Sequence, residues 1–539
     1  MIKLINRITI IAAALSLTAC TGGFLKKNSD PYAVDGDELS RDGYAIRLAL
    51  TGMADGVISP DVNTTQFTEC LLGGTMSGYL ADANAGWANT ISNYNPTDNW
   101  TNVFMQSDRV IPMVYTNYAM LHRVTENPVL LAVGDVIKVA AMHRVTDTYG
   151  PIPYSRIGVG GKLQVEYDSQ ADVYKSMIEE LDAASEILMK NRTTNFAASS
   201  DIIYGGVTEK WAKFANSLRL RLAMRISYAD PELAKKTAEA AVNNEVGVIT
   251  SNADNARRIS FGVDGNPINR AVKYNMAQHT PACVTGGDSH AAADIVTYMN
   301  GYDDPRRSAY FTVSEWGGSY EGLRRGIVIP DHAATGHKYS GVNITEASPV
   351  VWMNAAEVAF LKAEAAAVFG FDMGGDAKDF YNEGIRLSFE QWNVGSADAY
   401  IANGSRTPAA YVDPAGTNTY GGALSSITVA WDDAATVEQK QERIITQKWI
   451  ANWLLGNEAW ADWRRTGYPV LIPATDAGNK SNGMVDSAKG ARRMPYPSDE
   501  YVNNASNISA AVSTMLRGAD NMNTRLWFDC KPNNPSYID

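Results

Sequence analysis

Apolar residues recur at helical spacing through most of the chain, and this pattern predicts a mainly α-helical protein. In one segment Val173, Met177, Leu181, Ala184 and Leu188 fall on a single helix face, because residues three or four apart share a face. Segments with the same period are 130–145, 211–222 and 379–392. The pattern indicates a large core built from packed amphipathic helices.

Residues 444–469 form the segment richest in tryptophan. Its four indoles stand at whole-turn spacing, at Trp449, Trp453, Trp460 and Trp463. This predicts one long helix with a buried indole stripe. Thr436 and Gln439 match a capping box at its start. Arg464 and Arg465 follow near its end, where planar guanidinium groups suit carboxylates or backbone carbonyls.

Small residues in the second half of the chain predict closely packed helix pairs. An alanine-rich helix is expected to open at Ser348-Pro349 and to end at Gly370, and a short glycine break separates it from the helix over 379–392. Small residues on facing sides let two helices approach closely. Such a pair resembles a tetratricopeptide unit, although no strict repeat period is visible.

The helical pattern lapses between about residues 253 and 347, and this span predicts a loop-rich ligand-binding segment. It is far longer than an ordinary connector. Trp316 and Tyr320 flank a glycine pair within it. Paired rings on a polar loop can stack against sugar faces. The alternative is a loop held in place by its own aromatic side chains.

A second polar, glycine-bearing stretch extends from about residue 71 to residue 100. The candidates for ligand contact there are Tyr79, Asp82, Asn84, Trp87 and Tyr94. Trp87 and Tyr94 follow no helical spacing, so we expect their rings to face a ligand, with core packing as the alternative. The Gly73-Gly74 pair is not a phosphate-binding loop, because no Gly-Lys-Ser/Thr follows it.

The composition and charge of the chain argue against a nucleic-acid partner. The chain has 539 residues, of which 45% are hydrophobic and 20% charged, which is typical of a large folded protein. The formal net charge is -12 and the basic residues are scattered. We therefore expect no nucleic-acid partner, because such binding depends on clustered positive charge.

The N-terminus predicts export and lipidation. Residues 1–19 combine a basic start with an apolar run too short to span a bilayer, and they predict a signal peptide. Leu17–Cys20 matches a lipobox, in which Cys20 is acylated. An ordinary secretory signal is the alternative. Residues 20–41 are then a polar tether, and residues 42–539 form the body.

The sequence contains no complete motif for a metal site or for a catalytic site. The acidic residues of the tether are candidate ligands of a structural calcium ion, but they lack the spacing of an EF-hand. His332 and His337 on a glycine-bearing loop are a candidate metal pair, with exposed polar histidines as the alternative. No Gly-x-Ser-x-Gly or His-Glu-x-x-His motif is present. We therefore expect no catalytic residue, no metal site and no other cofactor.

Five short motifs in chain order carry a family resemblance. They are Leu17–Cys20, His143–Tyr154, Ala355–Ala365, Glu458–Pro469 and Arg492–Pro497. Together they resemble the SusD/RagB family of outer-membrane nutrient-binding lipoproteins of Bacteroidetes. The resemblance covers essentially the whole mature chain, and it is closest to the divergent SusD-like branch.

The resemblance implies a cell-surface binding protein rather than an enzyme, with a helical body, tetratricopeptide-type helix pairs and long irregular loops. It implies a lid on a SusC-like TonB-dependent barrel that passes on captured glycan or, in RagB-like members, peptide. A surface glycoside hydrolase is the less favoured alternative. Binding aromatics vary in position within the family, so the resemblance favours only regions, around residues 79–94 and 298–320.

Overall fold

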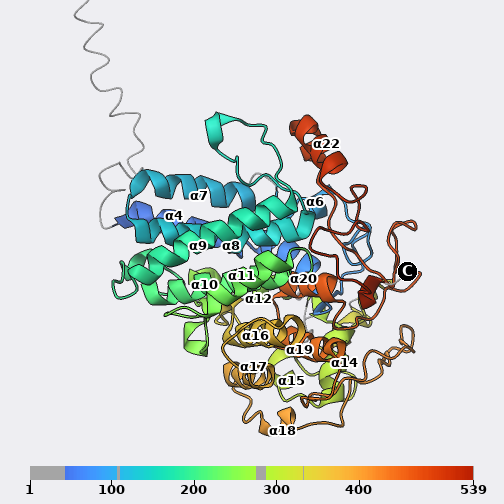
Figure 1. Cartoon of the computed structure of the whole chain (residues 1–539). Helices are drawn as coiled ribbons and strands as arrows, with labels where there is room; N and C mark the ends of the chain where they lie inside the picture. The colour runs from blue at the N-terminus through green and yellow to red at the C-terminus, as the bar shows by residue number, and fades with distance from the viewer. Residues whose placement is uncertain (1–42, 106–109, 275–286, 332, 538–539) are drawn as a thin grey trace, which may run out of the picture.

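The computed structural model describes residues 43–105, 110–274, 287–331 and 333–537 (Figure 1). Helices dominate these ranges, and the strands within them are four short ones. The predicted mainly α fold is confirmed. Among the described residues, no helix combines the length and the apolar character needed to span a bilayer.

The first half of the body is a stack of antiparallel helices. The stack comprises α4 (Tyr44–Asp55), α7 (Val110–Val124), α8 (Pro128–Tyr149), α9 (Gln170–Lys190), α10 (Thr208–Arg225) and α11 (Pro231–Val242). From α7 onward each helix packs against the next one in the chain, and α4 packs against α7. Helix α8 is buried along most of its length, because neighbours cover it on several sides. On α9 the predicted apolar face, from Val173 to Leu188, is buried.

A second group of helices forms the other half of the body. It comprises α16 (Ala355–Phe369), α17 (Ala377–Trp392), α19 (Val437–Ala451) and α20 (Gly456–Thr466). The predicted close pair is α16 with α17. A Cβ atom added at Gly384 on α17 would lie 2.8 Å from the Phe360 ring of α16, so glycine permits this approach. Gly370 ends α16 in the left-handed conformation, with φ 66°.

The expected start of the alanine-rich helix at Ser348-Pro349 was wrong. Residues after Ser348 form strand β4 (Val350–Met353), which pairs antiparallel with β2 (Ala256–Arg258). The following helix begins only after Asn354, whose side chain caps it. The β-branched valines favour the strand, and its partner lies far away in sequence.

The long tryptophan helix is in fact two helices, α19 and α20. The helical conformation is interrupted between them, where Leu454 takes a left-handed φ of 70°. All four indoles are nevertheless buried, with exposures of 1–6%. The capping box of Thr436 and Gln439 is present.

The remaining elements are short. The α-helical ones are α5 (Val62–Thr65), α6 (Asp98–Thr101), α12 (Pro267–Val272), α14 (Ala293–Tyr302), α15 (Arg307–Tyr310), α18 (Asp398–Ile401), α21 (Ser498–Asn503) and α22 (Ala505–Thr514). A π-helix, η2 (Gln66–Gly74), leads into β1 (Leu80–Asp82), which pairs with β3 (Ser289–Ala291). The 3₁₀ turns are η3 (Val159–Gly161), η4 (Ala198–Ser200), η5 (Asn252–Asp254), η6 (Gly262–Asp264), η7 (Gly336–Lys338) and η8 (Pro535–Tyr537).

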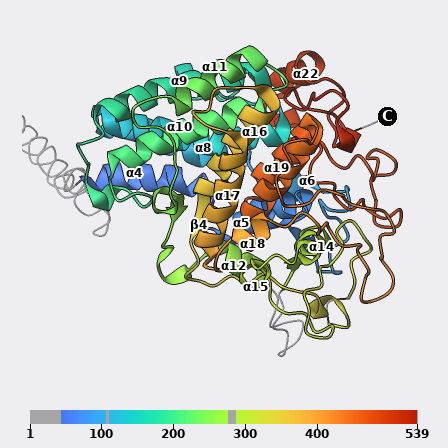
Figure 2. The same ribbon diagram turned by 60° about the horizontal axis from the view of Figure 1, so that its bottom comes forward.

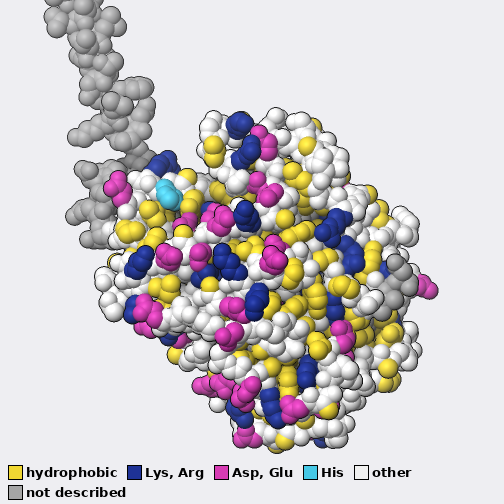
Figure 3. All heavy atoms as spheres, viewed as in Figure 1, with side chains coloured by type: hydrophobic (Ala, Val, Ile, Leu, Met, Phe, Trp, Pro, Cys, Tyr) yellow, Lys and Arg dark blue, Asp and Glu magenta, His cyan; other side chains and the backbone are white. Residues whose placement is uncertain are grey.

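Helices and loops are separated in space. In Figures 1 and 2 the stacked helices occupy one side, and irregular chain surrounds α14 on the other. On the face drawn in Figure 3, acidic and basic side chains are interspersed over the helices. The loop-rich side is therefore the place to look for a ligand site.

Candidate ligand-binding site

Strands β1 and β3 join the two segments that the sequence singled out as ligand-binding loops. They run antiparallel, with Leu80 opposite Ala291 and Asp82 opposite Ser289. The backbone N–H of Ala83 donates to the Asp288 carbonyl at 2.7 Å, which extends the pairing by one bond. The loop that carries Trp87 therefore begins on the same small sheet as the segment after residue 287.

The Trp316 loop is fastened to the other edge of β3. The N–H of Leu323 donates to the Ala291 carbonyl, and the N–H of Ala291 donates to the Ser340 carbonyl, both at 2.9 Å. The Asn93 amide links the Trp87 loop to the same region by donating to the Ile327 carbonyl at 2.9 Å. Both predicted loops thus rest on one shared scaffold.

Three of the candidate rings are partly exposed on this scaffold, namely those of Trp87, Trp316 and Tyr320. The Trp316 ring meets the Tyr339 ring edge-on at 6.2 Å, and Lys338 Nζ lies 5.2 Å from its centroid. The Trp316 indole N–H is buried and has no hydrogen-bond partner among the described residues. Each ring is therefore covered by the protein on part of its surface and exposed on the rest.

Two other candidate rings, Tyr79 and Tyr94, belong to the core, with exposures of 0% and 4%. Tyr79 stacks on Trp449 with centroids 5.6 Å apart, and its hydroxyl donates to the Trp449 carbonyl. The expectation that these two rings face a ligand disagrees with this burial. Aromatic residues without helical spacing can still be core residues where an irregular segment crosses the interior. Tyr298 on α14 is buried in the same way.

Asp82 at the end of β1 and Asn84 two residues later are buried, with exposures of 3% and 8%. The Ser92 hydroxyl donates to Asp82, and the Asn84 amide donates to Asp288 Oδ1 at 3.2 Å. Burial, with the Asp288 carboxylate adding to it, raises the pKa of Asp82 to about 7. In this structure these polar groups hold the loop to the scaffold and do not face solvent.

The remaining sequence candidates concern metals and lipidation. His337 Nε2 lies 3.4 Å from Glu315 Oε2, whereas His332, Cys20 and the acidic tether lie outside the described residues. Within the described ranges, no three His, Cys, Asp or Glu side chains are grouped so that they could hold a metal ion.

Comparison with solved structures gives close relatives over most of the chain. A SusD homologue from Bacteroides uniformis is 56% identical, covering 91% of this chain and 100% of that one, with a TM-score of 0.88. A SusD homologue from Bacteroides ovatus is 39% identical, covering 91% and 100%, with a TM-score of 0.82. A chitin-binding SusD homologue from Flavobacterium johnsoniae is 36% identical, covering 90% and 99%, with a TM-score of 0.81.

No curated protein sequence matches this chain. The family model of SusD and RagB outer-membrane lipoproteins matches residues 26–529. The match spans the helical body, both small sheets and the candidate loops. The chain therefore belongs to the SusD-like family of outer-membrane lipoproteins.

Proposed function

We propose that this protein captures glycan at the cell surface and delivers it, as a lid, to a SusC-like TonB-dependent transporter. The observation that carries the proposal is the set of partly exposed rings, Trp87, Trp316 and Tyr320, on loops fastened to one scaffold. Membership of the SusD-like family and the chitin-binding homologue from Flavobacterium johnsoniae support it. Acylation of Cys20 would hold the protein on the membrane.

Stacking on flat rings explains how such a site holds sugar. A pyranose presents a weakly polar face that an indole covers, while its edge hydroxyls need hydrogen bonds. The polar side chains and backbone groups of the exposed loop residues supply such groups. Each contact is weak, so several sugar units are expected to bind together. The ligand is retained and not cleaved.

Removing the exposed indoles tests the proposal. Trp316→Ala and Trp87→Ala should each weaken glycan retention by about tenfold or more, because large aromatic contacts dominate such interfaces. Affinity electrophoresis in gels containing a bound polysaccharide measures the retention. Thermal unfolding should change little in both variants, because neither ring is fully buried.

Trp431→Ala is the matched control. This indole is also half-buried, but it packs on Tyr381 and donates to Asp433 away from the candidate loops. Glycan retention by this variant should equal that of the wild type. Normal retention by both loop variants would show that the glycan site lies elsewhere. Binding of peptides alone would instead favour a RagB-like role on the same transport route.

A further inference from the structure

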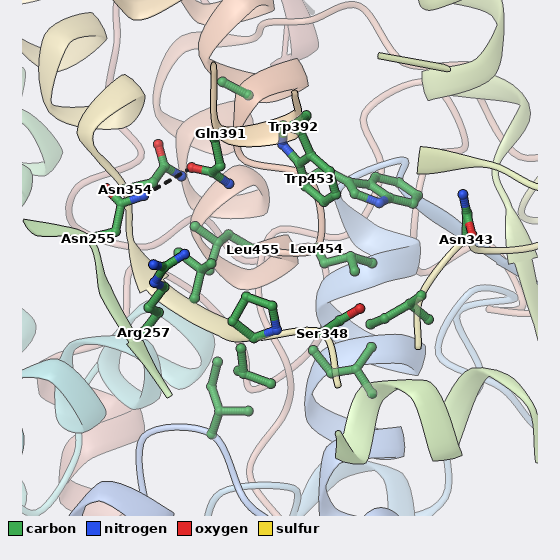
Figure 4. Close-up of a pocket in the computed structure, with 17 residues that line it drawn as sticks. Asn255, Arg257, Asn343, Ser348, Asn354, Gln391, Trp392, Trp453, Leu454 and Leu455 are labelled. Atoms are coloured by element: carbon green, nitrogen blue, oxygen red, sulfur yellow. Dashed lines mark hydrogen bonds between the residues drawn. The ribbon is translucent and has the colours of Figure 1, made fainter. Parts of the chain in front are cut away.

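A pocket that none of the candidate rings Trp87, Trp316 and Tyr320 lines lies between strands β2 and β4 and the ends of three helices (Figure 4). Its cavity volume is about 150 Å³. Arg257 comes from β2, Trp392 is the last residue of α17, and Trp453 to Leu455 form the break between α19 and α20. An engineered cavity of about this size accommodates a single aromatic ring.

Arg257 supplies the positive charge of this pocket. A β-bulge between Ala256 and Arg257 shifts the register of β2 against β4, and bulges re-aim side chains. The Arg257 guanidinium makes no hydrogen bond or ion pair with any described residue. Its neighbour Arg258, by contrast, pairs with Asp55. Among the described residues that line the pocket there is no Asp or Glu, although the chain as a whole has a net charge of -12.

The polar groups close to Arg257 in Figure 4 are either already bonded or are donors. The Asn255 amide donates to Gln391 Oε1 at 3.2 Å, and the Asn255 oxygen accepts from the Ala355 N–H at 2.8 Å. The Gln391 side-chain nitrogen has no partner in the described chain. The Trp392 indole N–H is buried and likewise unbonded there. The unpaired Arg257 guanidinium and the free Gln391 nitrogen are both hydrogen-bond donors, so they favour a ligand that accepts hydrogen bonds.

The rest of the pocket is apolar. The two indoles lie side by side in Figure 4, and Leu454 and Leu455 form the wall beneath them. Trp453 is held by stacking on Tyr310 at 5.3 Å, and Trp392 meets the same ring edge-on at 4.7 Å. Leu454 keeps a strained left-handed φ of 70°, and such strain clusters at binding sites. The walls are therefore rigid and shaped for a flat or short apolar body.

We propose that this pocket binds a small monocarboxylic acid with a single ring or a short branched chain as its body. The carboxylate takes the unpaired Arg257 fork, which matches it in geometry and charge. The apolar body enters between Trp392, Trp453 and the leucines. A neutral sugar fits less well, because its hydroxyls would leave the guanidinium without a charge partner. The pocket shares no lining residue with the proposed glycan-binding rings Trp87, Trp316 and Tyr320.

Phenylacetate is a suitable probe, with 2-phenylethanol as its uncharged counterpart. Titration calorimetry and saturation-transfer NMR should show saturable binding of phenylacetate to the wild type, with a Kd of about 1 mM or tighter. Arg257→Gln should weaken this binding by about tenfold or more, because a charge-assisted hydrogen bond is lost. Arg270→Gln is the control, since Arg270 on α12 is exposed and does not line the pocket.

The affinities of the wild type for the two ligands can be compared without any variant. This comparison tests carboxylate recognition even if Arg257→Gln folds poorly. Phenylacetate should bind at least about tenfold more tightly than 2-phenylethanol. Three outcomes overturn the proposal: no phenylacetate binding by the wild type, equal affinity for the two ligands, or unchanged affinity in Arg257→Gln. Glycan retention should be the same in Arg257→Gln and in the wild type, which separates this test from that of the loops.

Discussion

At the scale of single residues, Asp82 shows how the stability of the loop scaffold depends on the protonation state of one buried carboxyl group. Its side chain is 3% exposed, one carboxyl oxygen accepts from Ser92, and the other has no partner among the described residues. Burial raises its pKa to about 7, so the folded protein holds a proton that the unfolded chain loses near pH 4. The contribution of this group to stability is complete below pH 4 and is lost as the pH rises to 7.

Asp82→Asn removes this titration and should make stability less sensitive to pH. Between pH 5 and pH 8, the free energy of unfolding of the wild type should fall relative to the variant by roughly 2–3 kcal/mol. Urea denaturation of both proteins at several pH values measures the difference. A difference that stays constant over this range would mean that Asp82 does not bind a proton in the folded state.

The arginines at the end of the tryptophan segment show what sequence can and cannot predict at this scale. Arg465 forms a two-point ion pair with Glu364 at 2.8 and 2.7 Å, and Arg464 donates to the Asp147 and Arg492 carbonyls. Partners of both kinds were predicted from the shape of the guanidinium group. Which residues are these partners could not be predicted, because a pairing between distant residues leaves no local pattern in the sequence.

At the scale of elements, amphipathic spacing predicted the helices well and their ends less well. The buried face of α9 and the cap of α19 follow from local sequence. The break before α20 and strand β4 do not, because both are set by tertiary contacts. For the same reason, the β1–β3 pairing that joins the two candidate loops was not foreseen.

Trp460 on α20 provides the test of the buried indole stripe. It is 1% exposed, donates to the Ala491 carbonyl at 3.2 Å and lies against the Arg464 guanidinium. Trp460→Ala should lower the free energy of unfolding by about 3–5 kcal/mol, because it opens a large cavity in the core. Chemical denaturation measures this change, with Trp316→Ala as the half-buried comparison. A Trp460→Ala variant as stable as the wild type would contradict the packing described here.

At the scale of the whole molecule, the protein divides into a rigid helical body and a loop-rich face. The body is stabilised by buried helices and paired charges, and the loops hold aromatic rings on a two-stranded scaffold. Family resemblance predicted this division, and the fold confirms its helical part. Which rings are exposed depended on three-dimensional packing: Tyr79 and Tyr94 are buried, whereas Trp87, Trp316 and Tyr320 are not.

The most direct test of the account is to titrate a soluble form that lacks Cys20 with a panel of polysaccharides and peptides by calorimetry. The ligand is then recovered and its chain length determined. We predict saturable binding of one class of glycan, weakened by Trp87→Ala and by Trp316→Ala, with the glycan recovered at its original length. Shortened glycan, or binding of peptides with no response to any polysaccharide, would contradict glycan capture by the loops.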